Sequence, residues 1–255
     1  MSIDYSRLAE IYDIYVRVTQ DIPFFLRETK KTDGSVLELM AGTGRLSLPL
    51  LAAGVDLTCV DRSPEMLVIL RKKLAARGMI APIYQMDVCQ LALARQYDLI
   101  LLPFNSFSEI TSQADQLLAL RRIYDHLADG GRFICTLHNP VIRLKTLDGQ
   151  LRLIGDYPRS DGKGRLFFWL IEKLDSQTGI VDGRQFYEEY DEKGTMVSKF
   201  FVDTNFALIS KEQFENLASE AGLEVTDLYG DYGYDEFTPE ESPSLVYVFE
   251  KRSKK

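Results

Sequence analysis

Between residues 35 and 138, short apolar runs alternate with segments in which apolar residues recur at helical spacing. The runs are apolar throughout and their connections are short, which is typical of parallel strands covered by helices on both faces. We therefore expect a doubly wound α/β fold for this part of the chain. The expected strands are Ser35–Met40, Val55–Asp61, Pro82–Gln85, Tyr97–Leu102 and Arg132–Leu137, with helices over 45–53, 64–77 and 113–127.

The segments before and after this region follow other patterns. Ser2 to Glu28 has helical spacing, and 148–164 is polar and glycine-rich, which predicts a loop. An antiparallel meander is expected next, and Ser210 is expected to cap a helix that ends before Gly222. The strands expected in the meander and after this helix are Leu166–Leu174, Ile180–Tyr190, Met196–Phe206, Leu223–Tyr229 and Leu245–Glu250.

This order of elements divides the chain into four parts. They are an N-terminal helical cap (1–33), an α/β core (34–140), an antiparallel β insertion (141–206) and the end of the core (207–255). The insertion follows the fifth strand of the core, where the ligand crevice of such a sheet lies. We therefore expect it to act as a lid over a bound substrate.

The composition argues against several classes of protein. The 255 residues carry a net charge of −8, with 38 acidic against 30 basic residues, which argues against binding to nucleic acid. The sequence has no apolar stretch of about 18 residues, so we expect no membrane span. The N-terminus lacks the pattern of a signal peptide. The three cysteines lack the spacing of metal ligands, so we expect no metal site. Two of them lie in patterns typical of buried strands rather than of disulfides, which indicates a reducing compartment, so we expect a cytoplasmic protein.

Candidate binding groups follow three successive strands. Gly42 and Gly44 form a turn after the first strand, where glycine lets a ligand approach the backbone. Asp61 ends the second strand, where a carboxylate can accept hydrogen bonds from both hydroxyls of a ribose. Asp87 and the amide of Val88 follow the third strand and could bind the edge of an adenine. Each feature alone has a structural explanation, but together they predict an adenosine site.

A dinucleotide is one possible ligand of such a site. Ser47 stands where a dinucleotide-binding turn has its third glycine, and because serine is small this argues only weakly against a dinucleotide. Glu38 argues more strongly, because an acid before the turn would repel a pyrophosphate but could hold a cationic amino group. The only Tyr-x-x-x-Lys pattern, Tyr247 to Lys251, lies in a strand pattern rather than on a helix. A nicotinamide-dependent oxidoreductase therefore remains only as an alternative.

The motifs resemble those of class I S-adenosylmethionine-dependent methyltransferases with a Rossmann-like fold. The resemblance covers about 35–140 and 210–250, and the N-terminal AEIYDIY resembles the helix that covers the cofactor in that family. It implies a seven-stranded, mostly parallel sheet with an antiparallel last strand, and transfer of a methyl group to nitrogen or oxygen of a small molecule. The segments that carry it are ELMAGTGR, CVDRSPEML, YDLILLPFNSF, HLADGGRFICTLHNP, AGLEVTDLYGDY and LVYVFEKR.

The same resemblance implies roles for individual residues. Ala41, Gly42 and Gly44 would offer their backbone to S-adenosylmethionine, and Glu38 and Tyr12 would orient its methionine end. Met40 departs from the glycine or alanine usual at its position and would contact the cofactor. The others would bind ribose (Asp61), flank the adenine (Arg62, Met66), read its edge (Asp87, Val88) and lie near the sulfonium (Leu102, Pro103).

The acceptor side offers few candidate bases, because the chain has only two histidines. His138 follows the fifth strand and is the candidate catalytic residue, whereas His126 lies on a helix and is interpreted as structural. Tyr15, Asn105 and Tyr187 are the candidate substrate contacts. We expect a monomer or homodimer without nucleic-acid or membrane partners, and a non-catalytic cofactor-binding subunit remains a second alternative.

An acidic, aromatic loop near the C-terminus gives one more hypothesis. Four aromatic residues and three acidic residues lie there: Tyr229, Tyr232, Tyr234, Phe237, Asp231, Asp235 and Glu236. Aromatic rings and carboxylates together can bind a cation. The loop could therefore receive a cationic acceptor such as a protonated amine.

Overall fold

The computed structural model describes residues 3–252, so Ser2 of the first expected helix lies outside the described residues. Its larger sheet has seven strands in the order β10-β11-β5-β4-β1-β2-β3. All neighbours are parallel except β11, which runs antiparallel to both β5 and β10. This confirms the doubly wound sheet with an antiparallel last strand. Its strands are β1 (Val36–Leu39), β2 (Leu57–Asp61), β3 (Ile83–Gln85), β4 (Tyr97–Leu102), β5 (Leu127–His138), β10 (Leu223–Tyr229) and β11 (Ser244–Lys251).

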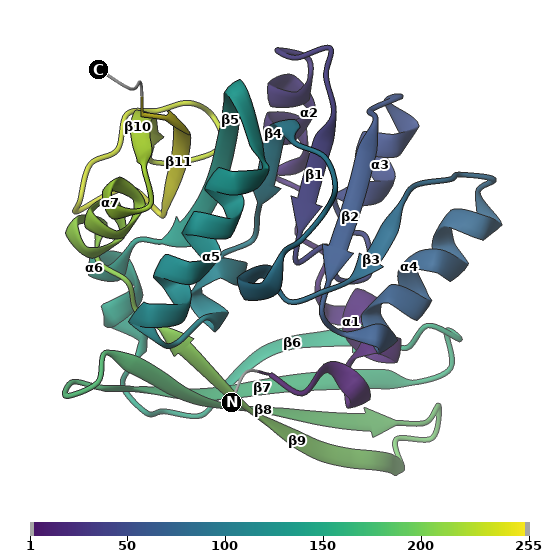
Figure 1. The fold of residues 1–255 in the computed structure, drawn as a ribbon. Helices are drawn as coiled ribbons and strands as arrows, with labels where there is room; N and C mark the ends of the chain where they lie inside the picture. Colours follow the sequence, from purple (N-terminus) through teal and green to yellow (C-terminus); the bar gives the residue numbers. More distant parts are fainter. Residues whose placement is uncertain (1–2, 253–255) are drawn as a thin grey trace.

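Helices cover both faces of this sheet (Figure 1). On β4, Ile100 packs into the core formed with α5 and α7, while the neighbouring Leu99 and Leu101 pack into the core formed with α2, α3 and α4. A strand buried on both sides has no solvent face, which explains its uninterrupted apolar sequence. The helices are α1 (Ala9–Tyr15), α2 (Ile22–Thr29), α3 (Ser47–Ala52), α4 (Pro64–Ala76), α5 (Gln113–His126), α6 (Pro140–Arg143) and α7 (Lys211–Glu220), with short 3-10 turns η1 (Tyr5–Arg7), η2 (Val88–Gln90), η3 (Ser106–Glu109) and η4 (Leu144–Thr146).

The insertion after β5 is a separate four-stranded antiparallel sheet in the order β6-β7-β8-β9. Figure 1 shows it as a layer across one end of the main sheet, with α1 beside it. Leu8 and Ile14 of the N-terminal segment share a core with Leu166 and Tyr187 of this sheet. Apolar packing therefore holds the N-terminal segment against the inserted sheet. Its strands are β6 (Arg152–Pro158), β7 (Arg165–Asp175), β8 (Ile180–Tyr190) and β9 (Met196–Ala207).

Two expectations about the elements were wrong. The expected loop over 148–164 contains β6, an edge strand whose Leu153 and Ile154 are exposed and which is bulged before Gly155. A strand with glycine, proline and exposed apolar residues does not show the alternation that marks a strand. The first core helix begins at Ser47 rather than Arg45. The left-handed backbone of Gly42 and Gly44 delays its start.

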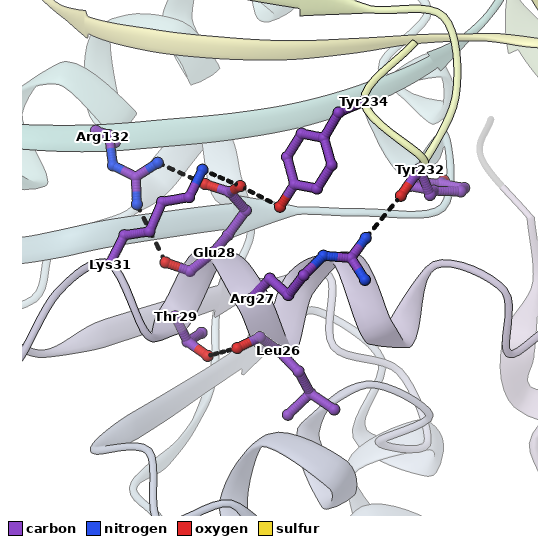
Figure 2. Close-up of polar contacts among 8 residues, drawn as sticks. All are labelled: Leu26, Arg27, Glu28, Thr29, Lys31, Arg132, Tyr232 and Tyr234. Atoms are coloured by element: carbon purple, nitrogen blue, oxygen red, sulfur yellow. Dashed lines mark hydrogen bonds and ion pairs between the residues drawn. The ribbon is translucent and has the colours of Figure 1, made fainter.

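The last loop, residues 230–243, is tied to the rest of the protein through Glu28 (Figure 2). The Glu28 side chain is 1% exposed and accepts hydrogen bonds from Lys31, Arg132 and the Tyr234 hydroxyl, each 2.6 Å long. Burial raises the pKa of Glu28, but these three donors outweigh it and leave the pKa below its ordinary value. Glu28 thus joins α2, β5 and the last loop.

The aromatic side chains of this loop also face the core. The Tyr232 and Tyr234 rings pack against Phe24, and Asp231 accepts hydrogen bonds from loop amides, including that of Gly233. None of the loop residues lines a cavity described below. The aromatic rings thus anchor the loop on α2, and the hypothesis that the loop receives a cationic acceptor stays a prediction.

Among the described residues, no helix combines the length and the apolar character needed to cross a membrane. The same residues contain no group of three or more histidine, cysteine, aspartate or glutamate side chains able to hold a metal ion.

Candidate active site

The turn after β1 brings the backbone of the chain close to the end of β2. The amide of Gly42 donates a 2.7 Å hydrogen bond to Asp61 Oδ2, while Asp61 Oδ1 accepts from the amide of Ser63 at 2.8 Å. Met40, Gly42 and Gly44 all have positive φ. A Cβ on Gly42 would meet nothing within 4 Å, whereas one on Gly44 would lie 2.4 Å from a methyl carbon of Leu70. Gly42 thus leaves space for a ligand, and Gly44 allows α4 to pack closely.

A cavity of 230 Å³ lies beside this turn, at the carboxyl ends of β1, β2 and β3. We call it the adenosine cavity, after the site expected there. Asp61 faces it although only 9% of the residue is exposed, and burial raises the pKa of its carboxyl group. Asp87 also lines it while accepting a 2.8 Å hydrogen bond from the amide of Cys89. The expected residues that line this cavity are Tyr12, Met40, Gly42, Asp61, Arg62, Met66, Asp87 and Val88.

A small recess of 40 Å³ lies on the other side of the glycine turn. Glu38 lines it, is 2% exposed and accepts a 2.5 Å hydrogen bond from the Ser47 hydroxyl. Burial raises the pKa of Glu38 to about 7, against the lowering effects of Ser47 and the nearby Arg45. Ala41 and Pro103 also line the recess. A buried carboxyl group at this place suits a cationic ligand group better than a phosphate.

A larger cavity of 510 Å³ separates the main sheet from the insertion. It is lined by three residues that the sequence analysis placed on the acceptor side, Tyr15, Asn105 and His138. His138 ends β5 and is exposed, with its surface lining this cavity, although many protein atoms lie around the ring. Burial, and secondly the charge of Arg143, lower the pKa of His138 to about 4, so the ring is neutral at pH 7. The insertion contributes mainly apolar side chains, among them Phe168.

The three cavities meet at a few side chains. Tyr12 and Ser106 line all of them, and Tyr5 and Glu109 line both the adenosine cavity and the large cavity. Phe104 and Asn105, next to Ser106, have φ of 62° and 61°, a conformation that is strained for residues other than glycine. Such strain is common where a loop is shaped for function. A group bound in the first cavity and a group bound in the large one would therefore meet here.

Three expected site residues do not line a cavity. Tyr187 is fully buried and stacks on Phe168 with ring centroids 5.1 Å apart. Its hydroxyl donates to Gln185, which does line the large cavity, so direct contact of Tyr187 with a substrate was wrongly expected. Leu102 is fully buried in the core, and Gly44 faces Leu70. Leu102 and Gly44 therefore support the site through packing and do not line it.

His126 has the structural role that was expected. Its ring accepts a hydrogen bond from the amide of Leu93 at 2.9 Å and bonds the carbonyl oxygen of Arg122 at 2.7 Å. One ring nitrogen thus holds the segment that precedes β4, while the other is bonded within α5 itself.

Comparison with known proteins gives one consistent answer. A family model described as a methyltransferase domain matches residues 36–131. A cypemycin N-terminal methyltransferase from Streptomyces sp is 28% identical, over 84% of this chain and 82% of the relative. A glycine/sarcosine N-methyltransferase from Halorhodospira halochloris is 27% identical, over 88% of this chain and 78% of the relative.

The protein is a class I S-adenosylmethionine-dependent methyltransferase. Its fold agrees with this. The crystal structure of an S-adenosylmethionine-dependent methyltransferase from Clostridium acetobutylicum ATCC 824 matches it with a TM-score of 0.81 at 20% identity, over 98% of this chain and 99% of that one. The nicotinamide-dependent oxidoreductase and the non-catalytic subunit considered from the sequence are therefore both set aside.

The side chains of this methyltransferase fit its methyl donor. The open space at Gly42 admits a ligand against the backbone, and Asp61 presents a carboxylate to the adenosine cavity. Glu38 presents a second carboxyl group in the recess, where the amino group of a methionine moiety would be held. S-adenosylmethionine supplies an electrophilic methyl group when bound, and the protein supplies position and charge around it.

Several lining residues of the methyltransferase were not anticipated. Tyr5 and Glu109 belong to the junction of the cavities, and Arg143, Glu172 and Gln185 line the large cavity. Glu109 follows the predicted fourth strand by a few residues, and this proximity was the only signal available for it. The Tyr5 hydroxyl donates to Glu109 across 104 positions of sequence at 2.7 Å, a contact that no local pattern reveals.

Proposed function

We propose that this methyltransferase transfers the methyl group of S-adenosylmethionine to the nitrogen of a small-molecule amine bound in the large cavity. The observation that carries the proposal is the junction at Tyr12 and Ser106, where all three cavities meet. In-line transfer requires donor and acceptor to be held in contact, and positioning of this kind supplies much of a rate enhancement. The curated relatives reported above support nitrogen as the acceptor atom, since both are named N-methyltransferases.

The protein's side chains suit an amine that arrives with a free lone pair. A neutral amine needs no base during the transfer itself, whereas a hydroxyl group does. His138 remains our candidate catalytic residue, and its pKa of about 4 makes it an uncharged hydrogen-bonding partner rather than a strong base. We propose that Tyr15 and Asn105 contact the acceptor from the same cavity. The insertion would act as the lid that keeps water away from it.

The division of the chain into parts, the location of the protein and its oligomeric state are also proposed. We propose the division into a cap over 1–33, a core over 34–140, a lid over 141–206 and a closing segment over 207–255. A cytoplasmic location and a monomeric or homodimeric state belong to the same proposal.

A transfer assay tests the acceptor class. The protein is incubated with S-adenosylmethionine and matched pairs of small amines and alcohols, and methylated products are identified by mass spectrometry. We expect methylated amines and formation of S-adenosylhomocysteine, with the alcohols unchanged. Methylation of the alcohols alone, or no transfer to any amine, would contradict the proposal.

A further inference from the structure

Glu109 is a buried carboxyl group with one oxygen left without a hydrogen-bond partner. It ends η3, and its side chain is 9% exposed. Oε1 accepts a 2.7 Å hydrogen bond from the Tyr5 hydroxyl, whereas Oε2 accepts none and lies 4.0 Å from the nearest guanidinium nitrogen of Arg62. An unsatisfied buried polar atom costs free energy and requires an explanation, and a bound ligand or a catalytic role is one such explanation.

The position of Glu109 limits what that ligand can be. Among residues 3–252, four side chains line both the adenosine cavity and the large cavity: Tyr5, Tyr12, Ser106 and Glu109. Burial raises the pKa of both tyrosines far above neutrality, and serine does not ionise near pH 7. Glu109 is therefore the one side chain at this junction that can carry a negative charge. A cationic or hydrogen-bond-donating group would supply the partner that Oε2 lacks.

Ionised groups on the surrounding elements set how readily Glu109 ionises. Burial raises its pKa to about 7, the Tyr5 hydroxyl and the Arg62 charge lower it, and the Asp61 charge raises it. Because this pKa lies near neutrality, Glu109 can either give or take a proton without a large cost at pH 7.

The wall of the large cavity limits the rest of the acceptor. Its 510 Å³ lies within the range of pockets for drug-sized ligands. Phe168, Leu170 and Val181 of the insertion give it an apolar surface. Within the described part of the chain one arginine lines it, Arg143, which is already paired with the buried Glu172 and donates to Thr146. The cavity thus offers space for an apolar body but no free arginine for the carboxylate of a small amino acid.

We infer that Glu109 Oε2 receives the nitrogen of the acceptor, and that the acceptor is an amine with an apolar or aromatic body rather than a small amino acid. This rests on the proposed function. An amine that enters as an ammonium ion forms an ion pair with Glu109. Its N–H bond then breaks, the electron pair stays on nitrogen, and the proton forms an O–H bond on Oε2. The freed lone pair points toward the junction where the methyl group is presented.

Calorimetry on the complex with S-adenosylhomocysteine tests this without relying on turnover. The probes are 2-phenylethylamine, its neutral counterpart 2-phenylethanol, and glycine. The proteins are the wild type, Glu109→Gln, Glu109→Asp and the exposed control Glu192→Gln. Gln keeps an oxygen for the Tyr5 hydroxyl, so the fold is expected to persist, and melting temperatures check this.

The wild type is expected to bind 2-phenylethylamine more tightly than the alcohol or glycine. Glu109→Gln should weaken the amine about ten- to a hundredfold, the usual value of a charged hydrogen bond, and Glu109→Asp should recover part of it. S-adenosylhomocysteine and alcohol binding should stay within about twofold in every variant. Amine affinity of the wild type should rise from pH 6 to pH 8, and Glu109→Gln should lose this rise.

Several outcomes would overturn the inference. Unchanged amine binding in Glu109→Gln would do so, and so would equal weakening of the amine and of S-adenosylhomocysteine, which would place Glu109 in the cofactor site. A wild type that prefers glycine, or binds none of the amines, would also do so. Failure of the proposed function is seen separately, as an absence of amine methylation in the transfer assay.

Discussion

Glu38 lines the small recess, and its replacement by glutamine should stabilise the protein while weakening its cofactor binding. The carboxyl group is 2% exposed, and burial raises its pKa from the ordinary 4.5 to about 7. A carboxyl group with a raised pKa contributes stability below its unfolded pKa and loses it as the pH rises through the folded value. Glutamine avoids this loss and still accepts the hydrogen bond from Ser47.

The magnitude follows from the two pKa values, which differ by about 2.5. Each pKa unit corresponds to about 1.4 kcal/mol, so the wild type is expected to be less stable than Glu38→Gln by about 3 kcal/mol at pH 8 and by about 1 kcal/mol at pH 5.5. Urea unfolding at both pH values measures the difference, with the exposed Glu240→Gln as a control that should show little change. A variant that is less stable than the wild type at pH 8, or a difference that does not change with pH, would refute the reasoning.

Three further results are expected. The affinity for S-adenosylmethionine should rise about tenfold between pH 6 and pH 8 as Glu38 ionises. Calorimetry should find no change of affinity with pH in Glu38→Gln. A wild-type affinity that does not change with pH would contradict this. Gly44→Ala should lower the free energy of unfolding by about 2–4 kcal/mol, because it adds a Cβ at φ +86 against Leu70. Gly42→Ala, at φ +57 with open space around it, should lower it by about 1 kcal/mol. Urea unfolding measures both, and equal losses would contradict the different packing of the two glycines. His138→Asn should lower kcat/KM for the amine about tenfold and leave the Kd of S-adenosylhomocysteine unchanged; a changed Kd would move His138 into the cofactor site.

The sequence predicts most of the main sheet because its strands are buried on both faces. Leu99, Ile100 and Leu101 alternate between two cores, so no polar residue interrupts them. The glycine turn and Asp61 are also readable, since a sharp turn and an acid at a strand end are local features. β6 is not readable, because Gly155 and exposed leucine and isoleucine give it no clear period.

The acceptor side of the site is harder to predict than the cofactor side. Its cavity lies between the main sheet and the insertion, so its wall depends on how two distant segments pack. Tyr187 illustrates this: a tyrosine on a strand was expected to face the substrate, but its ring fills the core beneath Phe168. Glu109 is a buried carboxyl group whose hydrogen-bond donor, Tyr5, lies 104 positions away in the N-terminal segment.

Asp61 offers the most direct test of where the cofactor lies. It should be titrated calorimetrically, as wild type, Asp61→Asn and Asp61→Ala, with S-adenosylmethionine, S-adenosylhomocysteine and NAD, after urea unfolding has shown that each variant is folded. We expect both sulfur nucleosides to bind the wild type and NAD not to bind. Loss of the carboxylate should weaken both about ten- to a hundredfold. Folded variants that bind S-adenosylhomocysteine as tightly as the wild type would contradict the placement of the adenosine beside Asp61 and the glycine turn.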